Sequence, residues 1–233
     1  MLERPPYFRQ MEVLNLTGSL IMGRLPEMRP LILMPGAFEK SSSNSQVLDT
    51  RDQVSFAGAH VPGSISMWED ILPSFTDWFL NYEKPVAFVC DPDHIEEIAR
   101  MMVRIGFDNF VGYLKGGMVG WAGAGKPIDS IKLLSVQELC DLLKREEDPF
   151  LLDIRGDDEI KGEGLKHGKN IHLIQLLENF DSVPKDRKMI PLCTSGYRSM
   201  IAASLLKRAG WENLVIPVGG LGAWQTLKCD FEL

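Results

Sequence analysis

An internal repeat constrains the fold of this chain more than any other feature of its sequence. The segment 47–51 runs from apolar residues into Asp-x-Arg, and the segment 151–155 repeats this pattern 104 residues later. Three further pairs of segments share an offset of 103 or 104 residues: 86–90 with 189–193, 106–109 with 210–213, and 116–121 with 219–224. A period of this length indicates a duplicated domain rather than a solenoid of short repeats.

Each copy alternates short apolar segments with segments whose apolar residues recur at helical spacing. This alternation is typical of a parallel sheet covered by helices on both faces, so we predict an α/β fold for both copies. The predicted strands are 46–49, 85–90, 110–113, 149–153, 189–192 and 214–217. The predicted helices are 52–57, 70–82, 94–105, 135–145, 174–180 and 197–209. Ser135 and Glu138 form a capping-box start for the helix 135–145.

The repeat also predicts the domain organisation. We expect a first domain over 31–122, a linker over 123–132 and a second domain over 133–233. Residues 1–30 show little periodicity, and we interpret them as an N-terminal arm or linker that packs on the first domain.

Charge and composition exclude several classes of function. The net charge of −7 gives no general attraction to nucleic acid or to an anionic membrane surface, so neither is predicted as a partner. No apolar run is long enough to cross a bilayer, and the N-terminus lacks the charged-then-apolar order of a signal peptide. The four cysteines are widely spaced, which indicates neither a disulfide framework nor a zinc site, and we predict a cytoplasmic protein. Cys140 is expected to fill core, and Cys229 to be a second thiol or to have no role.

The apolar run 189–192 ends at Cys193, and a helical pattern begins a few residues later. Backbone N–H groups and the dipole at a helix N-terminus stabilise an anion, so a thiol placed there ionises more readily than a free cysteine. Gly196 gives the loop backbone angles that other residues avoid, and Arg198 adds a positive charge. The sequence therefore predicts a loop that holds an anionic sulfur. A buried structural cysteine that precedes a helix is the alternative interpretation.

The motif Cys-x-Ser-Gly-x-Arg-Ser at 193–199, followed by a helix and by Gly-Gly-Leu-x-x-Trp at 219–224, resembles the rhodanese (sulfurtransferase) family. This resemblance implies two tandem rhodanese-like domains and a sulfur atom carried as a persulfide on Cys193. The spacing Cys-x4-Arg from Cys193 to Arg198 is typical of the sulfur-transferring members, whereas related phosphatases have one more residue in this loop.

The resemblance also implies roles for the residues around Cys193. The loop is expected to bind the outer sulfur and the substrate through Thr194, Ser195, Gly196, Tyr197 and Arg198. The family pattern Asp-x-Arg-x-x-x-Glu is present as Asp153, Arg155 and Glu159. Glu159 is expected to pair with Arg198, and Asp153 to support the loop. Arg155 is expected either to attract anionic substrates or to be structural.

The first copy keeps a cysteine in the matching loop but loses the residues that support its chemistry. Cys90 has neither the glycine nor the arginine, and Ser55 stands at the position of Glu159. Carboxylates near a thiol oppose thiolate formation, and four of them are close in sequence: Asp91, Asp93, Glu96 and Glu97. His94 is expected to be a surface group in an ion pair rather than a partner of Cys90. We therefore predict that the domain 31–122 is inactive.

The order of the segments along the chain resembles that of one particular group of rhodanese-containing proteins. An entry segment like 4–8, then a weak and then an intact rhodanese copy, is similar to the carboxyl-terminal part of persulfide dioxygenase–rhodanese fusions. The metallo-β-lactamase domain of those fusions is not in this sequence, whose four histidines form no His-x-His-x-Asp-His cluster. Dioxygenase activity is therefore not expected here. The expected partners are small sulfur-containing anions, thiols and a separate persulfide dioxygenase.

The predicted function is the transfer of a sulfane sulfur from thiosulfate or a persulfide to a thiol or cyanide, through a persulfide on Cys193. No metal or organic cofactor is expected. One alternative is a sulfur carrier or docking module that serves a separate enzyme without turnover of its own. A phosphatase or arsenate reductase is a further alternative, which the Cys-x4-Arg spacing disfavours.

Overall fold

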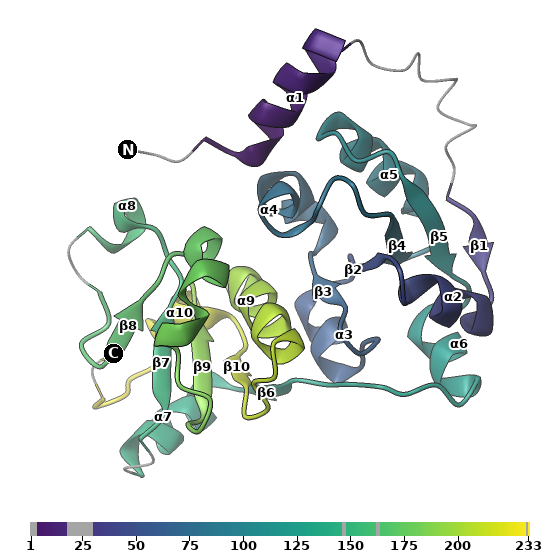
Figure 1. Cartoon of the computed structure of the whole chain (residues 1–233). Helices are drawn as coiled ribbons and strands as arrows, with labels where there is room; N and C mark the ends of the chain where they lie inside the picture. The colour runs from purple at the N-terminus through teal and green to yellow at the C-terminus, as the bar shows by residue number, and fades with distance from the viewer. Residues whose placement is uncertain (1–3, 18–29, 146–147, 162–163, 232) are drawn as a thin grey trace. The chain divides into compact units, whose positions relative to one another are not determined.

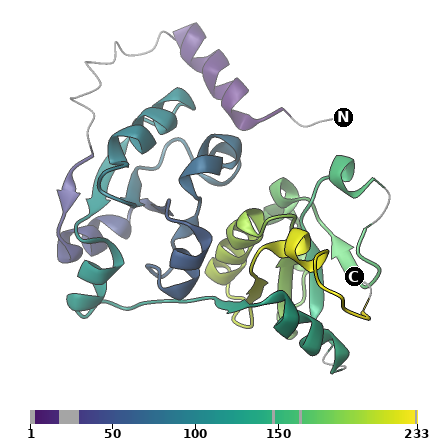
Figure 2. The same ribbon diagram turned by 180° about the vertical axis from the view of Figure 1, so that it is seen from behind.

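The computed structural model describes residues 4–17, 30–145, 148–161, 164–231 and 233. The chain divides into two compact units (Figures 1 and 2). The first unit comprises residues up to Asp52 together with Met67–Ile128, and the second comprises Gln53–Ser66 together with Asp129–Leu233. The segment 53–66 therefore belongs to the first repeat in sequence but packs with the second unit.

The first unit is built on parallel strands in the order β1-β5-β4-β2. Their bounds are β1 (Ile32–Leu33), β2 (Gln46–Asp49), β4 (Val86–Val89) and β5 (Phe110–Leu114), and the three strands predicted for this copy are confirmed. The helices are α2 (Pro35–Ser42), the 3-10 helix η2 (Glu69–Ile71), α4 (Leu72–Phe79), α5 (Ile95–Arg104) and α6 (Gly117–Gly123).

The strand order explains why helices cover both faces of this sheet. The connection from β1 to β2 crosses the sheet in one direction, whereas those from β2 to β4 and from β4 to β5 cross it in the other. Because parallel crossover connections are right-handed, α2 lies on one face and α4 and α5 lie on the other, as Figure 1 shows.

The N-terminal residues form a helix that their weak periodicity did not indicate. Helix α1 (Pro6–Thr17) packs against α4, and the backbone N–H of Tyr7 donates a hydrogen bond to Oδ2 of Asp77 at 3.0 Å. The described part of the predicted arm thus contacts the first unit. Residues 18–29 of that arm lie outside the described residues.

The second unit repeats the same strand order. Parallel strands pair as β8-β7-β9 and as β10-β6, and a parallel bridge between Met189 and Leu214 joins the two sets. The strands are β6 (Lys132–Leu134), β7 (Phe150–Asp153), β8 (Gly168–Asn170), β9 (Met189–Leu192) and β10 (Val215–Pro217). All three strands predicted for this copy are confirmed, and the α/β fold with two similar units is confirmed with them.

The helices of the second unit confirm most of the predicted ones. They are α3 (Gln53–Gly58), α7 (Val136–Lys144), α8 (Asp157–Ile160), α9 (Tyr197–Arg208) and α10 (Gly220–Trp224), and the short strand β3 (Ile65–Ser66) follows α3. The capping box at the start of α7 is present, with the backbone N–H of Glu138 donating to Oγ of Ser135 at 3.1 Å. The helix predicted over 174–180 is wrong in type, because two short 3-10 helices, η3 (Leu173–Gln175) and η4 (Leu177–Ser182), occupy this region.

Helix α9 is buried on all sides, since every residue from Ser199 to Leu206 is buried. The segment 53–66 supplies part of this cover, with α3 and β3 both in contact with α9. The backbone N–H of Ser66 donates to Oγ of the buried Ser204 at 3.1 Å. The same segment is tied to the start of β6, where the backbone N–H of Ile131 donates to the carbonyl oxygen of Ala57 at 2.9 Å.

The cysteine prediction needs a correction, because Cys140 and Cys229 form a disulfide. Cys140 lies on the buried face of α7, and the chain after α10 returns to it, so that the two Cα atoms are 6.1 Å apart. The two cysteines are 89 residues apart in sequence, and nothing in their spacing indicates the pairing. The prediction of a cytoplasmic protein rested in part on the absence of a disulfide pattern, and the disulfide removes this support. Among the described residues, no helix is long and apolar enough to cross a membrane.

Candidate active site

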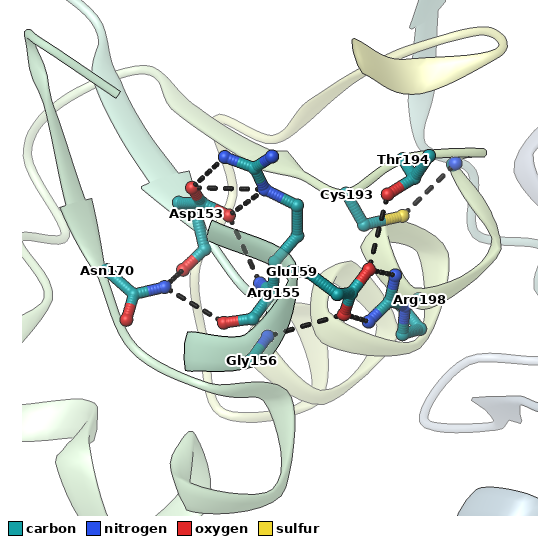
Figure 3. Close-up of polar contacts among 9 residues, drawn as sticks. Asp153, Arg155, Gly156, Glu159, Asn170, Cys193, Thr194 and Arg198 are labelled. Atoms are coloured by element: carbon teal, nitrogen blue, oxygen red, sulfur yellow. Dashed lines mark hydrogen bonds and ion pairs between the residues drawn. The ribbon is translucent and has the colours of Figure 1, made fainter. Parts of the chain in front are cut away.

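Cys193 lies directly after β9, at the point where the chain turns toward α9 (Figure 3). Gly196 is the N-cap residue of α9 and has a φ of 93°, a left-handed conformation that strongly favours glycine. The backbone N–H of Gly196 points back at the sulfur and donates a hydrogen bond to Sγ of Cys193 at 3.1 Å. The Cys193 side chain is fully buried. The predicted strand, loop and helix around the cysteine are therefore all present.

Arg198 is held by Glu159, which comes from α8. The guanidinium group makes a two-pronged ion pair with the carboxylate, with Nη2 donating to Oε2 at 2.6 Å and Nη1 donating to Oε1. Thr194 donates from Oγ1 to Oε2 of the same carboxylate at 3.3 Å. The ion pair expected between Glu159 and Arg198 is thus present, and it ties both ends of the loop to α8.

The electrostatics of this pair agree with its geometry. The hydrogen bond from Arg198 lowers the pKa of Glu159 to about 2, against the opposing effect of its partial burial. The pKa of Arg198 is raised, first by the hydrogen bond to Glu159 and further by the neighbouring Cys193. Arg198 is therefore a permanent positive charge beside the sulfur.

Arg155 is engaged by Asp153, the last residue of β7. Its backbone N–H and Nε donate to Oδ1 of Asp153 at 3.1 and 2.9 Å, and Nη2 donates to Oδ2 at 2.7 Å. Arg51 and Asp49 make the same set of bonds in the first unit. Because this arrangement recurs in the copy without the Gly and Arg of the loop, it favours a structural interpretation of Arg155.

The start of helix α10 supports the loop that contains Cys193. The backbone N–H of Leu221 donates to the carbonyl oxygen of Cys193 at 2.9 Å, and that of Gly222 donates to the carbonyl oxygen of Thr194 at 2.8 Å. A Cβ atom on Gly220 would collide with the carbonyl oxygen of Cys193. At the matching position of the first unit, a Cβ on Gly117 would meet open space.

The sequence indicated neither this support of the loop nor two other residues near the site, Asn170 and Gln53. The Gly-Gly-Leu motif at 219–221 was visible in the sequence, but only its contact with the loop shows what it does. Asn170 donates from Nδ2 to the carbonyl oxygens of Asp153 and Arg155 at 2.9 and 3.0 Å, and no sequence signal pointed to it (Figure 3). Gln53 lies against Gly196, with an Oε1 atom that is buried and makes no hydrogen bond.

The other predicted loop residues lie where the motif placed them. Thr194 and Ser195 are exposed at the turn, and Tyr197 and Arg198 are partly buried at the start of α9. The structure thus brings Cys193, Arg198 and Glu159 together. Asp153 and Arg155 form a neighbouring pair.

The first unit offers no comparable environment for Cys90. Burial, and after it the carboxylates of Asp49, Asp91 and Glu69, together raise the pKa of the Cys90 thiol to about 12. Carboxylates were expected to act on this thiol, but only Asp91 was among those named from the sequence. His94 pairs with Glu69, with 2.8 Å between Nδ1 and Oε1, as expected for a surface ion pair.

Known proteins resemble both copies. A family model described as "Rhodanese-like domain" matches residues 35–124 and 135–227, which together make up more than half of the chain. A protein named "Sulfurtransferase" from Allochromatium vinosum is 32% identical over 90 residues, which are 38% of this chain and 82% of the relative. "Thiosulfate sulfurtransferase GlpE" from Tolumonas auensis is 35% identical over 74 residues, which are 31% of this chain and 68% of the relative. A crystal structure of a thiosulfate sulfurtransferase from Pseudomonas aeruginosa aligns with a TM-score of 0.38 and 18% identity, over 86% of this chain and 43% of that one.

Proposed function

The chain belongs to the rhodanese-like domain family, and from this premise we propose that it is a sulfurtransferase that carries sulfur as a persulfide on Cys193. The relatives named as sulfurtransferases support sulfur transfer in general. Thiosulfate in one of these names makes thiosulfate the first donor to test, and a low-molecular-weight persulfide is the second. A thiol or cyanide is the proposed acceptor, and small sulfur-containing anions and thiols are the proposed binding partners.

In the proposed reaction, the Cys193 thiolate attacks the outer sulfur of the donor. The sulfur–sulfur bond of the donor breaks, and sulfite or a thiolate leaves with the bonding electrons. Cys193 then carries the outer sulfur as a persulfide anion. The acceptor attacks that sulfur, the new sulfur–sulfur bond breaks, and the Cys193 thiolate returns.

The residues of the loop have defined tasks in these steps. The N–H of Gly196, which donates to Sγ at 3.1 Å, stabilises negative charge on sulfur. Arg198 adds a positive charge that attracts the anionic donor, and Glu159 fixes its direction. The backbone N–H groups of Leu221 and Gly222 hold the loop carbonyl groups and so support the loop, in which the N–H of Gly196 faces the sulfur.

The observation that carries the proposal is the cysteine sulfur that accepts a backbone N–H beside an arginine fixed by a carboxylate. The test measures thiocyanate formed from thiosulfate and cyanide, together with the intact mass of the protein after incubation with thiosulfate. The wild type should gain the mass of one sulfur atom and turn over. Cys193→Ser should do neither.

Cys90→Ala is the matched control. Cys90 is the second free cysteine among the described residues, and because its pKa is raised to about 12 it should be a protonated thiol at neutral pH. It should retain wild-type turnover. Activity that survives Cys193→Ser, or that is lost in Cys90→Ala, would contradict the assignment of the site.

Burial of Cys193 favours a second candidate, a sulfur carrier that docks on another enzyme. The side chain is fully buried, which restricts access by free substrates. A stable persulfide mass on Cys193 without turnover, from either thiosulfate or glutathione persulfide, would favour this carrier. A separate persulfide dioxygenase in the cytoplasm is the proposed partner, on the basis of the order of the segments in the sequence.

A further inference from the structure

The last residues of the second unit are fastened to its core at several points. We call residues 225–231 the C-terminal strap. Cys229 of the strap is joined to Cys140 of α7, and Asp230 pairs with Lys144 of the same helix, with 3.3 Å between Oδ2 and Nζ. The ring of Phe231 packs against the ring of His167, with 5.3 Å between the centroids.

The strap is connected to the residues that support the active loop. Phe231 and Trp224 pack against a buried apolar cluster that includes Leu192 and Leu221. Leu192 precedes Cys193, and Leu221 donates its backbone N–H to the carbonyl oxygen of Cys193. The disulfide therefore fastens one end of a short segment whose other end, α10, holds the loop.

The two cysteines of the disulfide differ in exposure. Cys140 is almost completely buried on α7, whereas Cys229 is partly exposed between two exposed residues, Lys228 and Asp230. Cys229 is the more exposed partner, so it is the side that an incoming thiolate would attack, with Cys140 as the leaving group. Thiol–disulfide exchange depends on which sulfur is attacked and on access to it.

We propose that the Cys140–Cys229 disulfide is a modification site for low-molecular-weight thiols, and that its opening releases the C-terminal strap and weakens the support of the Cys193 loop. A thiolate attacks Sγ of Cys229, the Cys140–Cys229 bond breaks, and Cys140 leaves as a thiolate that takes a proton. A second thiolate attacks the mixed disulfide, which gives a free Cys229 thiol and the oxidised form of the small thiol. The two electrons that reduce the protein come from these two thiols.

The effect on sulfur transfer rests on the proposed function, while the exchange reaction does not. Thiols are proposed acceptors of the sulfur on Cys193, so the same class of compound would accept sulfur and open the disulfide. In a reducing cytosol, the disulfides that do occur are usually transient and either catalytic or redox-sensing. High thiol concentrations would thus lower the rate of sulfur transfer, because they open the disulfide and weaken the support of the Cys193 loop.

The first experiment maps the cysteines of the full chain. Protein purified without reductant is incubated with reduced glutathione, quenched with N-ethylmaleimide and digested for mass spectrometry. We expect glutathione on Cys229 with alkylated Cys140 at early times, and both cysteines alkylated later. A disulfide that stays intact in glutathione, or two thiols already free before it is added, would overturn the proposal.

The second experiment measures the consequence without any thiol present. Amide hydrogen exchange over 219–224 and turnover with thiosulfate and cyanide are compared for wild type, Cys229→Ser and Lys228→Ser. Cys229→Ser should exchange faster and turn over several-fold more slowly, whereas the neighbouring Lys228→Ser should match the wild type. Cys140→Ala breaks the same bond from the other side and should reproduce the shift.

The outcomes separate this proposal from the proposed function. Unchanged exchange over 219–224 in both cysteine variants would overturn the link between strap and loop. A wild type that transfers no sulfur would contradict the proposed function. The cysteine mapping and the exchange rates would still decide whether the disulfide opens and what it holds.

Discussion

At the scale of single residues, the chemistry of the site depends on one carboxylate that orients one arginine. Glu159 accepts two hydrogen bonds from Arg198 and a third from Thr194, so it defines both the direction of the positive charge and the shape of the loop. Its pKa is lowered to about 2, chiefly by Arg198. Because the folded-state pKa lies below the ordinary value of 4.5, the stabilisation from this pair is complete above pH 4.5 and is lost as the pH falls through about 2.

We therefore predict that Glu159→Gln lowers the rate of sulfur loading on Cys193, and that the deficit is constant between about pH 5 and 8. A hydrogen bond to a charged group contributes about 1.5–3 kcal/mol. The Glu159 side chain is 38% exposed, so solvent screens the pair and we expect the lower end, about a tenfold loss of rate. The measurement is the loading rate from thiosulfate against pH.

Asp158→Asn is the matched control, because Asp158 lies on the same short helix and is exposed. It should load sulfur at the wild-type rate. A deficit in Glu159→Gln that disappears within this pH range, or an equal deficit in Asp158→Asn, would show that the ion pair does not act as described.

At the scale of elements, the turn into α10 is shaped to fit the active loop. Gly220 and Gly117 occupy matching positions in the two repeats and have similar left-handed conformations, with φ of 56° and 53°. A non-glycine residue is strained in that conformation by roughly 1–2 kcal/mol at either position. Only at Gly220 would an added Cβ also meet the loop, at the carbonyl oxygen of Cys193.

This difference gives a prediction with an internal control. Gly220→Ala should displace the loop and reduce sulfur transfer at least tenfold, since overpacking at a closely fitted site costs about 1–3 kcal/mol beyond the backbone strain. Gly117→Ala carries the same backbone strain without the collision and should retain most of the activity. Turnover and melting temperature of the two variants are compared. Equal losses of turnover in both would mean that backbone strain alone explains the effect.

A comparison of the predicted with the observed helices and strands shows what could be predicted from the sequence. The longer strands and α9 were predicted because their apolar runs and their repeat at 103 or 104 residues are strong local signals. The strands β1, β3, β6 and β8 were not predicted, because segments of two or three residues carry little periodicity and their pairing with a neighbouring strand defines them. The loop after Cys193 and the ion pair between Glu159 and Arg198 were predicted from the family motifs. The support from Gly220 and Asn170 did not, because it depends on contacts between distant segments.

At the scale of the whole molecule, the boundary between the repeats in sequence is not the boundary between the packed units. The segment 53–66 contributes buried apolar side chains to the second unit, including Phe56, Val61 and Ile65. Without them, the buried surface of α9 loses part of its cover. The disulfide between Cys140 and Cys229 is invisible to sequence for the same reason, since tertiary packing alone brings the two together.

A fragment that comprises residues 129–233 therefore tests the organisation of the chain. It contains the whole active loop, but it lacks the hydrogen bond from Ser66 to Ser204 and the apolar cover of α9. Burial of one large apolar side chain contributes about 1.5–3 kcal/mol, so the loss of three such side chains removes several kcal/mol. Domains have a free energy of unfolding of about 5–15 kcal/mol, so this loss is a large fraction of the total. We expect the fragment to melt at a much lower temperature than the full chain, or to aggregate, and to transfer little sulfur. A fragment with the melting temperature and turnover of the full chain would show that the second unit is complete without the segment 53–66.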